Sequence, residues 1–170
     1  SVADGSGNAN GGSTGSATWT SQGKFGSALS FNGTNARVTV PDSNSLDLTT
    51  GMTLEAWVYP TATGLWRDVV YKGWDDVYYL ESSSDRGTPA TGAISLSGSL
   101  TGANPLPLNA WSHIAGTYDG ANVRLYVNGI QAASRPRTGN IATSTGALTI
   151  GGDPLYGQHF AGRIDEVRIY

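Results

Sequence analysis

The 170-residue chain contains no cysteine, which excludes disulfide bonds and thiolate metal sites. Charged residues make up only 14% of it, and Lys and Arg are scattered without a basic run. Nucleic acid and anionic membranes are therefore not expected partners. No apolar run approaches the ~20 residues that span a bilayer, and no signal peptide is recognisable. The chain starts at Ser1, which we interpret as the start of an excised domain or processed fragment.

Amphipathic helices are also missing, because no window repeats apolar residues at helical spacing. Residues 51–60 instead alternate, with Met52, Leu54, Ala56 and Val58 on one side. Successive side chains of a strand point to opposite faces, so this alternation predicts a half-buried strand. Gly51 and Pro60 bound it.

Further strands are expected at 26–31, 36–40, 65–72, 77–81, 93–96, 146–151 and 160–170. Asp119-Gly120 and Asn128-Gly129 separate alternating runs, which predicts a three-stranded meander over residues 111–133. Many short strands joined by Gly-rich turns predict an all-β fold of two packed antiparallel sheets. We expect residues 1–170 to form a single domain.

The first 16 residues are mostly Gly, Ser, Asn, Thr and Ala and are expected to form a loop. Within it, the oxygen-bearing side chains of Asp4, Ser6, Asn8 and Asn10 alternate with small residues. Such spacing suits a loop wrapped around a hard cation such as Ca²⁺. The alternative is a loop whose side chains bond its own backbone.

Five blocks occur in an order that resembles a known family. They are GSALSFNG (26–33), GMTLEAWV (51–58), WSHIAGTYDG (111–120), LYVNG (125–129) and GRIDEVRIY (162–170). The chain resembles laminin-G-like domains of the concanavalin A-like lectin/glucanase superfamily. The resemblance implies a jelly-roll sandwich, and a non-catalytic module of a secreted or cell-surface protein, often appended to polysaccharide-active enzymes.

The resemblance has two further implications. Relatives place Ca²⁺ between the N-terminal loop and an Asp of the last strand, which corresponds to Asp165 here. The implied structural calcium site is Asp4, Asn8, Asn10 and Asp165. Relatives also open with a strand that this chain lacks, so an unpaired strand edge is expected, at which another segment or chain could pair.

Catalytic carboxylates are not expected. Jelly-roll glucanases carry Glu-x-Asp-x-x-Glu on one strand, and no such stretch occurs here. His113 and His159 have no metal-ligand spacing. The sequence therefore predicts that the domain is not an enzyme.

A sugar site combines an aromatic platform with a few polar groups. Trp74, which precedes two carboxylates in a Gly-flanked loop, is the residue most typical of such a site. The predicted sugar-binding residues are Trp74, Asp76, Tyr78, Arg86, Tyr156 and His159. The alternative for Trp74 is a lid over the core, and Trp19, Trp57 and Trp111 are assigned to packing.

Together these observations predict a non-catalytic carbohydrate-binding module stabilised by Ca²⁺, with an oligo- or polysaccharide as its partner and an extracellular location. A protein-binding or adhesion module and a structural spacer are the alternatives.

Overall fold

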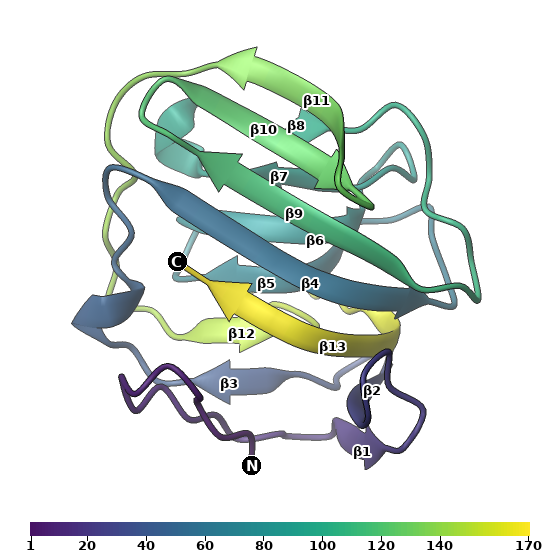
Figure 1. The fold of residues 1–170 in the computed structure, drawn as a ribbon. Helices are drawn as coiled ribbons and strands as arrows, with labels where there is room; N and C mark the ends of the chain where they lie inside the picture. The colour runs from purple at the N-terminus through teal and green to yellow at the C-terminus, as the bar shows by residue number, and fades with distance from the viewer.

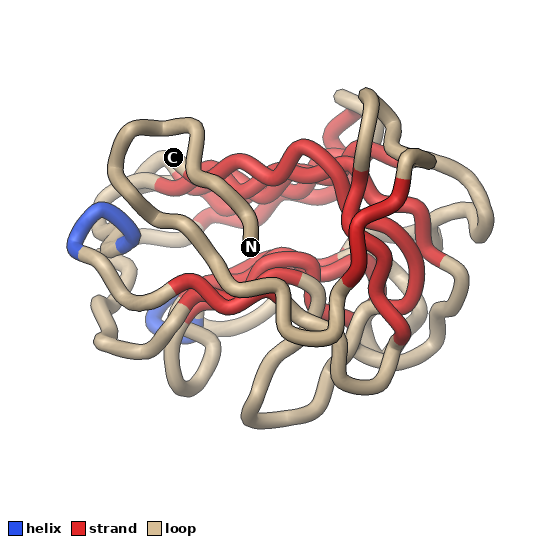
Figure 2. The backbone as a smooth tube through the Cα atoms, turned by 90° about the horizontal axis from the view of Figure 1, so that it is seen from below, coloured by secondary structure: helices blue, strands red, loops and turns tan.

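The computed structural model describes residues 1–170 and consists of two antiparallel sheets packed face to face (Figures 1 and 2). The first sheet has seven strands in the order β1-β2-β13-β4-β9-β10-β11. Its strands are β1 (Thr18–Thr20), β2 (Ala28–Asn32), β4 (Met52–Pro60), β9 (Ser112–Tyr118), β10 (Asn122–Val127), β11 (Ile130–Pro136) and β13 (Ala161–Ile169).

The second sheet has six strands in the order β3-β12-β5-β6-β7-β8 and lies behind the first in Figure 1. Its strands are β3 (Val38–Val40), β5 (Arg67–Lys72), β6 (Tyr78–Ser83), β7 (Ala90–Gly92), β8 (Leu100–Thr101) and β12 (Leu148–Ile150). The only helical segments are two short 3₁₀ turns, Asn44–Leu46 and Ile94–Leu96. Neither is long and apolar enough to cross a membrane. The predicted all-β sandwich is confirmed.

The core between the sheets follows from alternation in the strands. β4 is buried at every second residue, so Met52, Leu54, Ala56 and Val58 face the second sheet, as predicted. The meander β9-β10-β11 is also confirmed. Residues 93–96, predicted as a strand, instead form a 3₁₀ turn that follows β7. The short strands β1, β7 and β8 were not predicted.

β5 and β6 differ from β4, because every residue of β6 and all but the first of β5 are buried. Val70 and Leu80 belong to the core cluster, whereas Tyr71 and Tyr79 are buried outside it. Loops therefore cover the outer face of the six-stranded sheet.

One edge of the sandwich is open. β13 pairs with β2 only through residues 161–164, and beyond Ile164 it pairs only with β4. Figure 2 shows the N-terminus near the gap between the two layers on this side. A groove of about 630 Å³ lies there, between the N-terminal loop, β2, β3, β12 and the second half of β13. We call it the N-terminal groove.

Candidate functional site

The hairpin between β5 and β6 holds Trp74 in solvent. Gly73, Asp75 and Asp76 all have positive φ (85°, 85° and 55°), a region that Gly and Asp tolerate better than most residues. The backbone N–H groups of Asp75 and Asp76 donate to the Tyr71 hydroxyl at 3.1 and 3.3 Å. This tight turn leaves the Trp74 side chain 64% exposed. The lid alternative for Trp74 is therefore wrong.

Trp74 lines a groove of about 560 Å³ at this end of the six-stranded sheet. We call it the Trp74 groove. The other lining residues come from four segments and are mostly carboxylates, amides and hydroxyls: Asp42, Asn44, Asp47, Asp75, Val77, Ile94, Ala142, Thr143, Ser144 and Thr145. An aromatic ring thus stands beside several hydrogen-bonding side chains, the combination expected of a site for a polar ring with apolar faces.

Lys72, at the end of β5, connects the segment of Asp42 with the segment 144–146. Its ammonium group is fully buried and donates to Asp42 Oδ1 at 2.6 Å, to the Ser144 carbonyl at 2.9 Å and to the Gly146 carbonyl at 2.6 Å. The ammonium group has three hydrogens, and each has an acceptor. The groove wall is therefore held in one arrangement by a single nitrogen atom.

Buried acidic residues lie beneath the neighbouring loop 152–159. Asp68 and Glu81 are paired across β5 and β6, and Asp153 begins the loop. All three are buried, Asp68 and Asp153 completely. The Asp153 carboxylate accepts hydrogen bonds from the backbone N–H groups of Leu155, Tyr156 and Gln158, which fix the loop.

These surroundings shift the pKa values in opposite directions. Burial raises the pKa of Asp68 well above its ordinary value, and the carboxylates of Glu81 and Asp153 raise it further. Burial also raises the pKa of Glu81, with Asp76 and Asp153 adding to the effect. Burial alone would raise the pKa of Asp153, but the N–H groups that bond its carboxylate lower the pKa overall.

The loop also contacts the Trp74 hairpin. The Tyr156 hydroxyl donates to Asp75 Oδ1 at 2.9 Å, and this bond raises the Tyr156 pKa to about 12. Burial, followed by the charge of Asp75, raises the pKa of Asp76. Burial lowers the pKa of His159, which favours a neutral imidazole. The structure thus joins Tyr156 to the Trp74 hairpin through Asp75, with His159 further along the same loop. Of the predicted sugar-binding residues, only Trp74 lines the Trp74 groove.

Two predicted sugar-binding residues lie elsewhere. Tyr78 is fully buried in the core, and its hydroxyl donates to the Leu46 carbonyl at 2.9 Å. It cannot contact a ligand in this structure, so its prediction as a sugar-binding residue is wrong. Arg86 is exposed, but it follows β6 and lies at the opposite end of the sheet from the β5–β6 hairpin.

Several lining residues were not predicted. Asp42, Asp47 and the segment 143–145 lie in connections that give no local signal, and only the strand order β3-β12-β5 brings them to Trp74. For Asp68 and Glu81 a signal did exist. Each is a carboxylate within or at the end of an otherwise apolar strand run, and a buried charge of this kind demands a partner.

The predicted calcium residues do not form one ligand set. Asp4 accepts hydrogen bonds from Ser6 N, Ser6 Oγ and Asn10 N within its own loop, at 2.9, 2.7 and 2.9 Å. These bonds lower the pKa of Asp4. The Asn10 side chain bonds Ser45 Oγ instead. The exposed Asn8 adds only a backbone bond to Ser6 Oγ.

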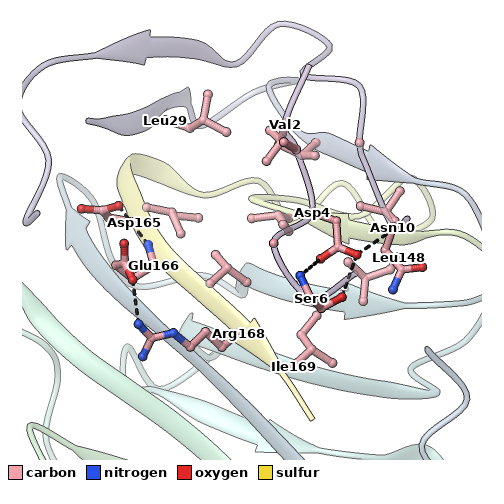
Figure 3. Close-up of a pocket in the computed structure, with 18 of the residues that line it drawn as sticks. Val2, Asp4, Ser6, Asn10, Leu29, Leu148, Asp165, Glu166, Arg168 and Ile169 are labelled. Atoms are coloured by element: carbon pink, nitrogen blue, oxygen red, sulfur yellow. Dashed lines mark hydrogen bonds and ion pairs between the residues drawn. The ribbon is translucent and has the colours of Figure 1, made fainter. Parts of the chain in front are cut away.

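Asp165 lies apart from Asp4, on the other side of β13 across the N-terminal groove (Figure 3). It accepts hydrogen bonds from the backbone N–H groups of Phe25 and Glu166, both at 2.9 Å. No group of three or more His, Cys, Asp and Glu side chains in the chain is arranged to hold a metal ion. The arrangement of Asp4 matches the self-bonded loop that the sequence left as an alternative, and calcium binding stays a prediction.

Aromatic side chains also line the outer face of the seven-stranded sheet, where they pack against each other and against cations. Trp57 contacts Phe25 and His113, and Trp111 contacts Tyr59. Lys24 Nζ lies 4.4 Å from the centre of the Trp57 ring, and the Arg163 guanidinium lies 3.8 Å from that of Tyr59.

The packing assigned to Trp57 and Trp111 agrees with these contacts. Trp19 is 57% exposed, so the same assignment is wrong for it.

Comparison with solved structures gives the same fold at low sequence identity. Domain 4 of AbnA, an extracellular arabinanase from Geobacillus stearothermophilus solved with arabinotriose, matches with a TM-score of 0.79 and 23% identity. The match covers 99% of this chain and 86% of that domain.

Two further structures are similar to this chain. The binding domain of Paraclostridial mosquitocidal protein 1 matches with a TM-score of 0.80 and 16% identity, over 99% of this chain and 45% of that one. Domains LG4-5 of the mouse laminin α1 chain match with a TM-score of 0.64 and 13% identity, over 84% and 42%. This chain thus spans less than half of these two structures.

A comparison with curated proteins gives no match. A family model, Laminin_G_3, described as the concanavalin A-like lectin/glucanases superfamily, matches residues 32–170. With the two-sheet sandwich already established, this match shows that the chain belongs to the concanavalin A-like lectin/glucanase superfamily, in its laminin-G-like branch.

Proposed function

We propose that this domain binds a neutral oligo- or polysaccharide in the Trp74 groove, as a non-catalytic module of a secreted or cell-surface protein. One observation carries the proposal: a largely exposed indole lines a groove otherwise rich in carboxylates and hydroxyls. The C–H face of a sugar ring packs on an aromatic ring, and its hydroxyls donate to carboxylates. The similar arabinanase domain solved with arabinotriose supports a sugar partner.

The charge of the groove favours an uncharged glycan. Asp42, Asp47 and Asp75 line it, and no Lys or Arg side chain does. Lys72 neutralises Asp42 from below but is fully buried. An anionic sugar would therefore meet repulsion, whereas neutral hydroxyls would find acceptors.

Titration calorimetry with arabinotriose and a panel of neutral polysaccharides tests the proposal. Trp74→Ala is expected to lower affinity at least tenfold, or about 1.4 kcal/mol, because the stacking platform is lost. Trp19→Ala is the matched control, since Trp19 is also more than half exposed but belongs to the seven-stranded sheet.

Equal loss of affinity in both variants, or none in Trp74→Ala, would place the sugar elsewhere. Absence of binding to every glycan would overturn the proposed function.

A second candidate function, polypeptide binding, is favoured by the open edge of β13. Arg168 and Tyr170 pair with β4, so the backbone groups of Val167 and Ile169 point to the side without a strand. The apolar N-terminal groove lies beside them. An extended segment with alternating apolar residues would satisfy both features. Its addition should slow hydrogen exchange at Val167 and Ile169, and unchanged exchange would exclude this candidate.

The proposed module includes the structural Ca²⁺ that the sequence predicts. A thermal melt with and without EDTA tests whether the domain binds calcium at all. An unchanged melting temperature would argue against bound calcium, and a lowered one would not identify its ligands.

A further inference from the structure

Three buried carboxylates meet on the outer face of the six-stranded sheet without enough hydrogen-bond donors. Asp68 and Asp153 are 0% exposed and Glu81 is 4% exposed. Both carboxylate oxygens of Asp68 and Oε2 of Glu81 are buried and have no hydrogen-bond partner. A buried carboxylate normally has a cation or several N–H donors, because removing an unpaired charge from water costs several kcal/mol.

Asp68 lies near each of the other two carboxylates. Asp68 and Glu81 are directly opposite each other in the β5–β6 ladder. Asp153 comes from the covering loop, which the Asp68 N–H joins by donating to the Gln158 carbonyl at 3.1 Å, and the Asp153 carboxylate is near enough to raise the pKa of Asp68. Asp68 is therefore an unpartnered, fully buried side chain next to two other carboxyl groups.

No protein cation balances this cluster. None of Asp68, Glu81 and Asp153 forms an ion pair with a Lys, Arg or His side chain, and the charged groups that most raise the pKa of Asp68 and Glu81 are other carboxylates. Lys72 is already bound to Asp42 and two carbonyls. The nearest guanidinium along the strand, that of Arg67, donates from Nη1 to the His159 carbonyl.

We propose that Asp68 and Asp153 bind a hard divalent cation, Ca²⁺ by the chemistry of its ligands, beneath loop 152–159. Two carboxylates neutralise one divalent ion, and Ca²⁺ accepts carboxylate oxygens together with backbone carbonyls. Glu81 adds negative potential from the adjacent strand. Because no three acidic or His side chains surround one point here, carbonyl oxygens or water would complete the shell.

This site is separate from the one that the sequence predicts. In the N-terminal loop, Asp4 already accepts three hydrogen bonds. Asp153 also accepts three from its own loop, but Asp68 beside it accepts none, which leaves both of its oxygens free for the ion. A cation at Asp68 would also fix loop 152–159, which carries Tyr156 to the Trp74 hairpin. The rival explanation is a proton shared between Asp68 and Asp153, and it requires no metal.

Thermal melts of the whole domain in EDTA and in excess CaCl₂ separate these explanations. For the wild type we expect Ca²⁺ to raise Tm by about 5 °C or more, since it binds only the folded state. Asp68→Asn should abolish this rise, and Asp4→Asn, the matched control in the N-terminal loop, should retain it. In EDTA, Asp68→Asn should melt no lower than the wild type, because the substitution removes an unpaired charge.

Terbium luminescence of the wild type provides a second measurement that needs no variant. Tyr71 and Tyr79 lie close enough to this cluster for its charges to raise their pKa values, so they should sensitise one bound Tb³⁺ that Ca²⁺ displaces. A wild type without any Tm rise or terbium signal would overturn the site in favour of the shared proton. A rise lost in Asp4→Asn but kept in Asp68→Asn would move the ion to the N-terminal loop. Neither result depends on glycan binding.

Discussion

The two sheets of the sandwich accommodate charged side chains in different ways. On the seven-stranded sheet, Trp57 and Tyr59 remain half-buried under Lys24 and Arg163, whose charges stay in contact with water. On the six-stranded sheet, Asp68 and Glu81 are buried beneath loops on the outer face, and Lys72 is buried on the face that it shares with its ladder partners Tyr78 and Leu148. The charged side chains of the first sheet can reorient in water at little cost. Those of the second are buried, so removing a partner leaves a polar group without a hydrogen bond.

Replacing one lysine beside each sheet should give the largest difference in stability. Lys72→Met removes the donor that Asp42 and the carbonyls of Ser144 and Gly146 share. It should lower the free energy of unfolding by about 3–5 kcal/mol. Lys24→Met removes a cation–π contact in solvent and should cost at most about 1 kcal/mol. Urea denaturation measures both losses of stability. Similar losses would contradict the claim that the buried lysine contributes more than the exposed one.

A pair of tyrosines tests the same contrast with neutral groups. The Tyr79 side chain is 3% exposed, and its hydroxyl bonds Ser99 Oγ at 2.6 Å. Tyr79→Phe should cost about 1 kcal/mol of unfolding free energy, because Ser99 loses its partner. Tyr59→Phe should change it by less than about 0.5 kcal/mol, since no residue bonds the Tyr59 hydroxyl. A reversed order would show that the loops cover the sheet only loosely.

The smallest expected effect concerns an exposed charge of the seven-stranded sheet. The Arg124 guanidinium and then the N–H groups of Asn122 and Ala121 lower the pKa of Asp119 to about 2. A lowered folded-state pKa stabilises the protein above the ordinary value near ~4, and this stabilisation is lost as pH falls toward about 2.

Asp119→Asn should therefore be slightly less stable than the wild type at pH 6 and equal to it at pH 2. Urea midpoints at the two pH values measure this, and a constant difference would contradict the pKa shift.

The sequence predicted elements whose two faces differ and was less informative where both faces are buried. Alternation located β4 and its core residues because one face of that strand is solvated. In β6, Tyr78 and Tyr79 are adjacent and equally apolar, so nothing local shows that Tyr78 faces the core and Tyr79 faces the loops. This is why Tyr78 was wrongly assigned to the sugar site.

The site was predictable only in part, for a related reason. Trp74 and its carboxylates are neighbours in sequence, and a Gly-flanked turn indicates exposure. Asp42 and Thr143 join them only through strand order. In the N-terminal loop, oxygen-rich spacing is the same whether the oxygens bind a cation or the loop's own N–H groups, and Asp4 does the latter here.

The way Lys72 holds the groove has a consequence for variation. In segment 143–146 its ammonium group donates to main-chain carbonyl oxygens, which every amino acid carries. Positions 143 and 145 can therefore change identity without loosening the wall. A randomised library at these two positions, built on an unaltered scaffold, is where altered selectivity should be sought first.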